Sequence, residues 1–508
     1  MAGRNGIVEA MECEPQPNDQ PLRADEVDDP VFPAACEGAA RPRFSPFVSI
    51  LSALLLLATL AAILWSSSNS PKLDRFDDPD RALDLMVSRT MEAQDGSVLA
   101  PSWQQWTSSW MSGSPQAERD QAIQWYRELV AVTGTPQAQL RLAILQGESG
   151  YRGEAVTAAQ AWKAEDAPVP LYARFIESAY GDRPLSRETE LALQAELAEA
   201  LPAGWFYNHL AARLAARAGD VALGETVARQ IRARGALVQQ RAHVLTLVEL
   251  SCLILGSVLL LRIVRLNGRR TDLVRLHQPG VPPPWPGGIG SAVLLRGGAL
   301  GAVVTLAFLS FAPIENVSLR ALAIPVANLP LLAMAYAYLL KPAGLNFRSG
   351  FGLQMHGTQA GRLAGIVLAV VAAGLWGEWV MGRVAEALHM TNHWTEWFDP
   401  DLVWASGSVL TISLLEYVVF APIFEELAFR GLLYAILRRR LTPLPAAMIS
   451  AGIFALAHGY GVIGFLSVFW SGLLWAWIYE RTGSVLPGII AHATNNLLVC
   501  VSVMALLR

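Results

Sequence analysis

The sequence predicts an all-α protein, a polytopic membrane bundle of about nine spans with an inserted extracytoplasmic helical domain. The chain has 508 residues, of which 53% are hydrophobic and only 16% are charged. This composition is typical of a membrane protein that also has a soluble part. Long apolar stretches recur along the second half, and the polar segment before them lacks the alternation of β-strands.

Residues 1–45 are predicted to form a disordered acidic tail, because they are rich in proline, alanine and acidic side chains. The tail is too long and too acidic for the first part of a signal peptide. An apolar stretch follows it, preceded by Arg41 and Arg43. Residues 46–66 are therefore predicted to be a transmembrane anchor.

Residues 70–242 are predicted to form a soluble helical domain, since alanine, leucine, glutamine, glutamate and arginine dominate it. Breaks at residues 147–153 and at Gly219-Asp220 divide it into helix–turn–helix units. Such units are similar to tetratricopeptide repeats, and a generic helical bundle is the alternative.

Residues 243–357 are predicted to hold transmembrane spans and a cytoplasmic loop. The span at Val244–Leu261 precedes a loop with five arginines between Arg262 and Arg275, which the positive-inside rule places in the cytoplasm. The soluble domain then lies outside the cytoplasm. Arginines that precede this span oppose the orientation, but long domains cross membranes largely regardless of charge. Further spans are predicted at residues 292–313, 321–340, 361–382, 405–437, 444–463, 465–479 and 485–507.

Three short motifs place ionisable or amide side chains inside the last apolar stretches. Ionisable groups at membrane depth are costly and usually functional. From the spacing to flanking basic residues, the first two motifs lie roughly 20 Å and the third roughly 16 Å from one membrane face. The side chains could thus converge on one cavity. The first motif contains Glu425, Glu426 and Arg430, the second contains Phe454 and His458, and the third contains His492 and Asn496.

The first motif suggests a division of labour between two adjacent carboxylates. On a helix Glu426 and Arg430 share a face and can pair, whereas Glu425 points away and stays free. A free carboxylate in a site of low dielectric constant suits a general base that activates water. The alternative is an ordinary salt bridge beside a spare acid.

The second and third motifs leave several interpretations open. His458 could orient the same water as Glu425, or simply bond to a neighbouring helix. His492 and Asn496 share a face and can both donate hydrogen bonds, as an oxyanion hole requires. Alternatively Glu425, His458 and His492 could hold zinc, although the sequence has no His-Glu-x-x-His motif.

Taken together, the three motifs resemble the CPBP family of CAAX prenyl endopeptidases type II and bacteriocin-processing intramembrane proteases, also called Abi. The resemblance covers residues 358–508. It implies an all-helical membrane bundle with an enclosed cavity, in which Glu425 and His458 activate water while His492 and Asn496 stabilise the oxyanion. Glu426 and Arg430 would brace the site. The family is often labelled metalloprotease, yet these side chains favour a mechanism without a cofactor, with zinc as the alternative.

The resemblance implies an intramembrane endopeptidase of the cytoplasmic (inner) cell membrane that cleaves a membrane-associated protein or peptide. The domain at 70–242 could recruit that substrate. The alternatives are a non-catalytic immunity or binding protein of the same fold, and a transporter with a buried ionisable relay. The chain has no large basic surface that would indicate nucleic acid, and its four scattered cysteines show no metal motif or disulfide framework.

Overall fold

A computed structural model describes residues 44–69, 72–111, 113–162, 168–266, 274–277, 280–285, 287–311, 317–354 and 357–508. All regular elements in these segments are helical, which confirms the predicted all-α class. The predicted acidic tail lies outside the described residues, apart from its last two positions.

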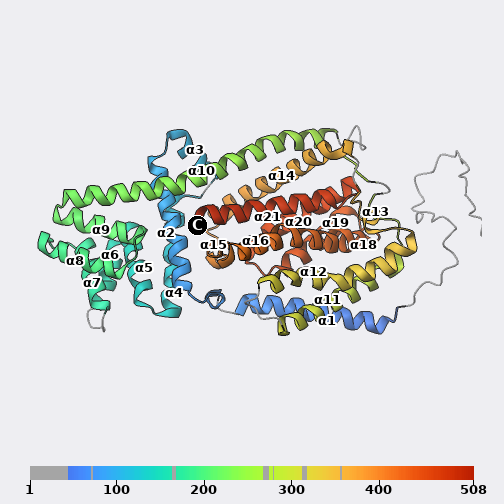
Figure 1. Ribbon diagram of the computed structural model, residues 1–508, viewed down its shortest axis with the longest axis horizontal. Coiled ribbons are helices and arrows are strands. Elements are labelled where there is room, and N and C mark those ends of the chain that lie inside the picture. The colour runs from blue at the N-terminus through green and yellow to red at the C-terminus, as the bar shows by residue number, and fades with distance from the viewer. Residues whose placement is uncertain are drawn as a thin grey trace, which may run out of the picture. The chain divides into compact units, whose positions relative to one another are not determined.

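The membrane part is a bundle of apolar helices (Figure 1). Among the described residues, eight helices are long and apolar enough to cross a membrane. They are α1 (Pro46–Asn69), α10 (Val221–Leu266), α11 (Gly290–Phe311), α12 (Val317–Ala335), α14 (Ala360–Ala387), the composite helix Ser408–Leu437, α20 (Val462–Thr482) and α21 (Leu486–Leu507).

A ninth apolar helix, α19 (Pro443–Ala457), is shorter than the predicted span at 444–463. Its 15 residues extend about 22 Å, whereas a hydrocarbon core is about 30 Å thick. The helix stops because the chain turns at His458–Gly461, where Gly459 has a φ of 65°. His458 is therefore part of a turn rather than of a helix that continues across the membrane.

The polar domain consists of short helices that pack against their neighbours in the chain. Its helices are α2 (Pro79–Leu99), α3 (Ser102–Met111), α4 (Pro115–Thr133), α5 (Pro136–Glu148), α6 (Arg152–Ala161), α7 (Val169–Tyr180), α8 (Arg187–Ala200) and α9 (Trp205–Ala218). The turn expected at Gly219-Asp220 has a clear cause. Gly219 adopts the left-handed conformation that ends α9, and the Asp220 carboxylate accepts from the Leu223 N–H at the start of α10.

The domain and the bundle share one continuous helix. The 46 residues of α10 leave the domain and enter the membrane part without a break (Figure 1). Two glycines let α10 approach its neighbours closely. A Cβ atom added to Gly96 of α2 would lie 2.3 Å from the carbonyl oxygen of Gly235 on α10. A Cβ atom added to Gly256 on α10 would lie 2.3 Å from the carbonyl oxygen of Leu368 on α14.

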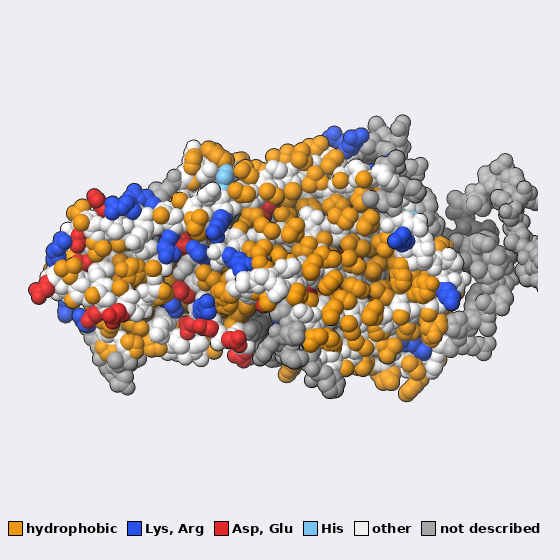
Figure 2. Space-filling model, in the orientation of Figure 1, with side chains coloured by type: hydrophobic (Ala, Val, Ile, Leu, Met, Phe, Trp, Pro, Cys, Tyr) orange, Lys and Arg blue, Asp and Glu red, His pale blue; other side chains and the backbone are white. Residues whose placement is uncertain are grey.

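The domain packs on the end of the bundle that carries the loop after α14. Phe76 stacks on Trp394 of that loop with ring centroids 4.9 Å apart. Leu507, at the end of α21, belongs to the same hydrophobic core as the domain. On the face shown in Figure 2, hydrophobic side chains cover most of the bundle, whereas most of the acidic and basic side chains lie over the domain.

Candidate active site

The helix that carries the first motif is irregular on both sides of the two glutamates. It runs through α16 (Ser408–Leu415), a π-helical turn η10 (Glu416–Phe420), α17 (Ala421–Glu426), a second π-helical turn η11 (Leu427–Tyr434) and α18 (Ala435–Leu437). Such turns are rare and frequently occur at functional sites. The wider turns change which side chains point into the bundle, so spacing in the sequence alone does not give their directions.

A proline explains how Asn496 is held. In η10 the Ala421 N–H bonds to the carbonyl oxygen of Glu416, five residues earlier. The next acceptor in this register is the Tyr417 carbonyl, but Pro422 has no N–H to donate. The side-chain amide of Asn496 donates to that carbonyl instead, at 2.9 Å. This bond fixes the Asn496 side chain and leaves its second amide N–H available.

Glu426 and Arg430 form a completely buried ion pair. The Arg430 Nη1 donates to Glu426 Oε1 at 2.8 Å, and both side chains are 0% exposed. The guanidinium also lies over the rings of Phe454 and Trp475, at 4.4 and 5.0 Å from their centroids. The aromatic faces and the opposite charge of Glu426 thus offset the loss of hydration of the buried Arg430 cation.

Glycines on the neighbouring helices make room for this pair. A Cβ atom on Gly472 of α20 would lie 3.0 Å from Arg430 Nη2, and one on Gly488 of α21 would lie 3.0 Å from Glu426 Oε2. Larger residues at either position would press on the charged groups.

Glu425 has a different environment from its neighbour. Its side chain is 24% exposed, and its Oε2 lies 3.9 Å from His492 Nε2. The other ring nitrogen of His492, Nδ1, lies 3.3 Å from Glu426 Oε1. His492 therefore sits between the two carboxylates, and its ring stacks on Trp475 with centroids 4.0 Å apart.

His458 is oriented by its own turn of chain. Its Nδ1 lies 2.8 Å from the Phe454 carbonyl oxygen. A carbonyl only accepts, so Nδ1 carries a hydrogen and the neutral ring leaves Nε2 as an acceptor. The Phe454 ring lies next to both histidines, at 4.7 Å from His458 and 6.0 Å from His492. In the described part of the chain no hydrogen bond or ion pair joins His458 to Glu425, so contact through one water stays a prediction.

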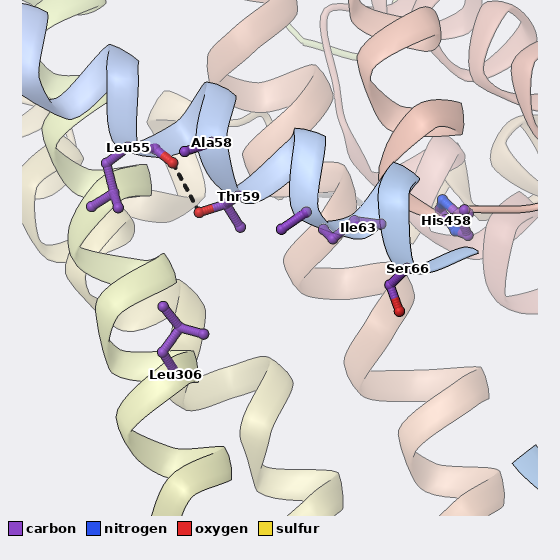
Figure 3. Close-up of a pocket in the computed structure, with 9 residues that line it drawn as sticks. Leu55, Ala58, Thr59, Ile63, Ser66, Leu306 and His458 are labelled. Carbon is purple, nitrogen blue, oxygen red and sulfur yellow. Dashed lines mark hydrogen bonds between the residues drawn. The ribbon is translucent and has the colours of Figure 1, made fainter. Parts of the chain in front are cut away.

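A groove opens next to His458. It has a volume of about 590 Å³ and is lined by α1, by Leu306 of α11, and by His458 and Gly459. Figure 3 shows the α1 side chains along one wall, with His458 beyond Ile63 and Ser66. Most of its lining side chains are apolar, and the Thr59 hydroxyl is already donated to the Leu55 carbonyl within α1 (Figure 3). The groove suits an apolar chain more than a polar ligand.

Residues 407–498 match the family model described as type II CAAX prenyl endopeptidase, Rce1-like. This match supports membership of the CPBP (Abi) family for that part of the chain. That family consists of intramembrane proteases, and the eight apolar helices make the chain a multi-pass membrane protein. No curated protein and no solved structure matches the chain.

All three motifs lie inside the CPBP match, and so does Trp475. The α1 helix, the polar domain and α10 to α14 lie outside it. The wall of the groove beside His458 therefore comes partly from a segment that the family match does not cover.

Three residues that shape this candidate site were not predicted from the sequence. Trp475 contacts both Arg430 and His492, while Tyr417 and Pro422 position Asn496. In the sequence Trp475 is one of several aromatic residues in an apolar stretch and gave no signal. The Pro422 signal was available, because a proline inside a span leaves a carbonyl without its helical partner.

The zinc alternative requires Glu425, His458 and His492 to surround one point. Among the residues that the structure describes, no group of three or more His, Cys, Asp or Glu side chains is arranged to hold a metal ion. Glu425 and His492 approach each other, whereas His458 faces Phe454 and Tyr460. The three alternative ligands are therefore not assembled around one point in the described residues.

Proposed function

We propose that this protein is an intramembrane endopeptidase that hydrolyses a peptide bond of a membrane-associated protein or peptide. One observation carries the proposal, beside the family match. Of two adjacent glutamates, Glu426 is fully buried and paired with Arg430, while Glu425 is 24% exposed and forms no ion pair with an arginine or lysine of the described residues. Glu425 is thus the carboxylate that water can reach and that can accept its proton.

In the proposed mechanism Glu425 and His458 activate one water molecule. The water donates a hydrogen bond to His458 Nε2 and gives its other proton to Glu425 as its oxygen attacks the scissile carbonyl. His492 and the second amide N–H of Asn496 stabilise the oxygen that becomes negative. Protonated Glu425 then donates its proton to the leaving amine, and the two peptide products separate.

The groove beside His458 is the proposed place for an apolar part of the substrate. Its α1 wall allows a direct test with two bulky substitutions on one helix. Ala62→Trp fills the groove, whereas Leu57→Trp changes a residue of α1 that is 62% exposed and does not line the groove. We expect Ala62→Trp to raise the KM for an apolar substrate, with Leu57→Trp unchanged. Equal effects of both variants would argue against this substrate path.

We further propose that the polar domain lies outside the cytoplasm. Arg438, Arg439 and Arg440 follow α18 directly, whereas the domain packs on the loop that contains Trp394 at the other end of the bundle. The positive-inside rule assigns the arginine end to the cytoplasm. Single cysteines introduced into the domain should react with an impermeant maleimide in intact cells. Reaction only after the membrane is opened would reverse the orientation.

The proposed activity is tested by comparing peptides in membrane fractions. Cells that produce the wild-type protein should contain cleavage products that are missing from cells with equal amounts of Glu425→Gln. Candidate substrates found in this way are then incubated with both purified proteins in lipid bilayers. Identical peptide profiles, together with no cleavage by purified wild-type protein, would favour a non-catalytic member of the family.

A further inference from the structure

A second cavity lies where the polar domain meets the bundle, away from the proposed active site. Its volume is about 350 Å³, within the range of small-ligand pockets. Helices α2, α5 and α10, the residues that lead into α9, and Trp404 of the bundle line it. Arg81 of α2 lies over the Trp404 ring, 4.8 Å from its centroid, and so closes one side of the cavity.

The charges of the lining side chains do not balance. Asp84 forms an ion pair with Arg141, with Oδ2 and Nη2 3.3 Å apart. Glu92 pairs with Arg89 at 2.8 Å and with Arg234 at 3.2 Å. With Arg81 included, the cavity is lined by four guanidinium groups and two carboxylates.

Two further features favour an anion in this place. Arg141 is 8% exposed, and its buried Nε has no hydrogen-bond partner; the Nε of Arg89 is in the same state. Buried arginine N–H groups without partners are costly unless a ligand accepts from them. The cavity also borders the N-terminus of the 14-residue helix α9, where Gly204 provides no side-chain cap. Backbone N–H groups at such an end attract anions.

We propose that this cavity binds an oxyanion, the phosphate or carboxylate of a small solute or of a lipid headgroup. Arginine forks match the oxygens of both groups. The lining arginines exceed the lining carboxylates by two positive charges. We therefore expect a ligand with a charge of about −1 to −2. Trp404 precedes α16, where the span starting at Ser408 begins, so a headgroup at the membrane surface is within reach of the cavity. This inference is independent of the proposed protease activity.

The ligand would contact the domain and the bundle together, so binding should raise the melting temperature of the full chain. The purified protein in phosphatidylcholine nanodiscs is titrated with inorganic phosphate at constant ionic strength. We expect a saturable rise for wild-type protein. Arg234→Gln should bind phosphate at least about 10-fold more weakly, because a charged hydrogen bond contributes about 1.5–3 kcal/mol. Arg232→Gln is the matched control, since Arg232 is exposed on the same helix, donates to the Ala228 carbonyl and does not line the cavity.

Arg141→Gln is a second variant, in the buried part of the cavity. If that variant fails to fold, Arg234→Gln still tests the proposal, because the Arg234 side chain is 36% exposed. Repeating the titration in phosphatidylglycerol nanodiscs separates the two sources. If the natural ligand is a lipid headgroup, phosphatidylglycerol should compete with phosphate and weaken its binding to wild-type protein. If the natural ligand is a free solute, phosphate binding should be the same in both kinds of nanodisc. The proposal is overturned if wild-type protein shows no saturable rise, or if Arg232→Gln loses the response as much as Arg234→Gln does.

Discussion

The side-chain amide of Asn496 on α21 donates to the backbone carbonyl of Tyr417, 2.9 Å away on the helix that carries Glu425. The carbonyl is free because Pro422 cannot donate to it in the π-helical register. A backbone irregularity in one span thus sets the position of a proposed oxyanion donor in another. It also links the helix of the proposed base to the last helix of the chain.

Removal of Asn496 should therefore weaken the fold as well as the proposed catalysis. Asn496→Ala leaves the Tyr417 carbonyl without a partner, which should lower the free energy of unfolding by about 1–3 kcal/mol. Pro422→Ala supplies the missing N–H, so the double variant should recover part of this loss. Thermal unfolding in detergent measures all three variants. If Pro422→Ala is equally costly with and without Asn496, the two residues are not coupled through this carbonyl.

Glu425→Gln should abolish turnover and leave stability unchanged. The carboxylate is partly exposed and its loss strands no buried arginine, so the melting temperature should stay close to that of wild-type protein. A missing general base should reduce kcat by at least about 100-fold. Cleavage of a reconstituted substrate and detergent melting are measured on the same preparations. An active Glu425→Gln protein would remove Glu425 from the proposed role.

Glu426→Gln should behave differently, because it strands the buried guanidinium of Arg430. Loss of one member of a buried pair costs about 3–5 kcal/mol. The double variant Glu426→Gln/Arg430→Met removes both charges and should be more stable than Glu426→Gln alone. Melting temperatures of the two variants decide this. A Glu426→Gln protein with wild-type stability would show that the pair is not a brace.

The polar domain should lose stability as the pH rises above neutral. His209 contacts Asp95 at 2.9 Å and Glu148 at 3.4 Å. Burial by itself would lower the pKa of His209, but the hydrogen bonds to the two carboxylates outweigh it and raise the pKa to about 9 from 6.5. Because the folded-state pKa is the higher one, the stabilisation is complete below pH 6.5 and is lost as the pH rises through about 9.

This shift corresponds to about 3 kcal/mol between the two limits. Tryptophan fluorescence during unfolding at pH 6 to 9.5 should report it, since Trp205 stacks on His209. His209→Gln is the control, and its stability should vary much less over the same range. An equal pH dependence in both proteins would mean that other groups cause it.

Chelation should leave the proposed protease active. The mechanism uses Glu425 as a base, and the side chains that could ligate zinc are not arranged around one point in the described residues. Purified protein should hold less than one zinc per chain and keep its kcat after dialysis against a chelator. Complete loss of activity, restored by one equivalent of zinc, would make Glu425 a ligand instead of a base.

The sequence by itself determined the fold class and the residues of the three motifs. Long apolar stretches impose helices on a chain in a membrane, because every backbone group must find its partner locally. The pairing of Glu426 with Arg430 also followed from their spacing. These properties depend on neighbours in the chain, which a sequence displays directly.

Only the tertiary structure decided which groups meet. The π-helical turns, the stop of α19 at His458 and the contacts of Trp475 with Arg430 and His492 arise from packing between helices. The arginine-lined cavity likewise joins residues from α2, α5 and α10 with Trp404 of the bundle. Helix periodicity gives the face on which a side chain lies, but the neighbouring helices determine what that face contacts, and with it which of two adjacent glutamates stays accessible.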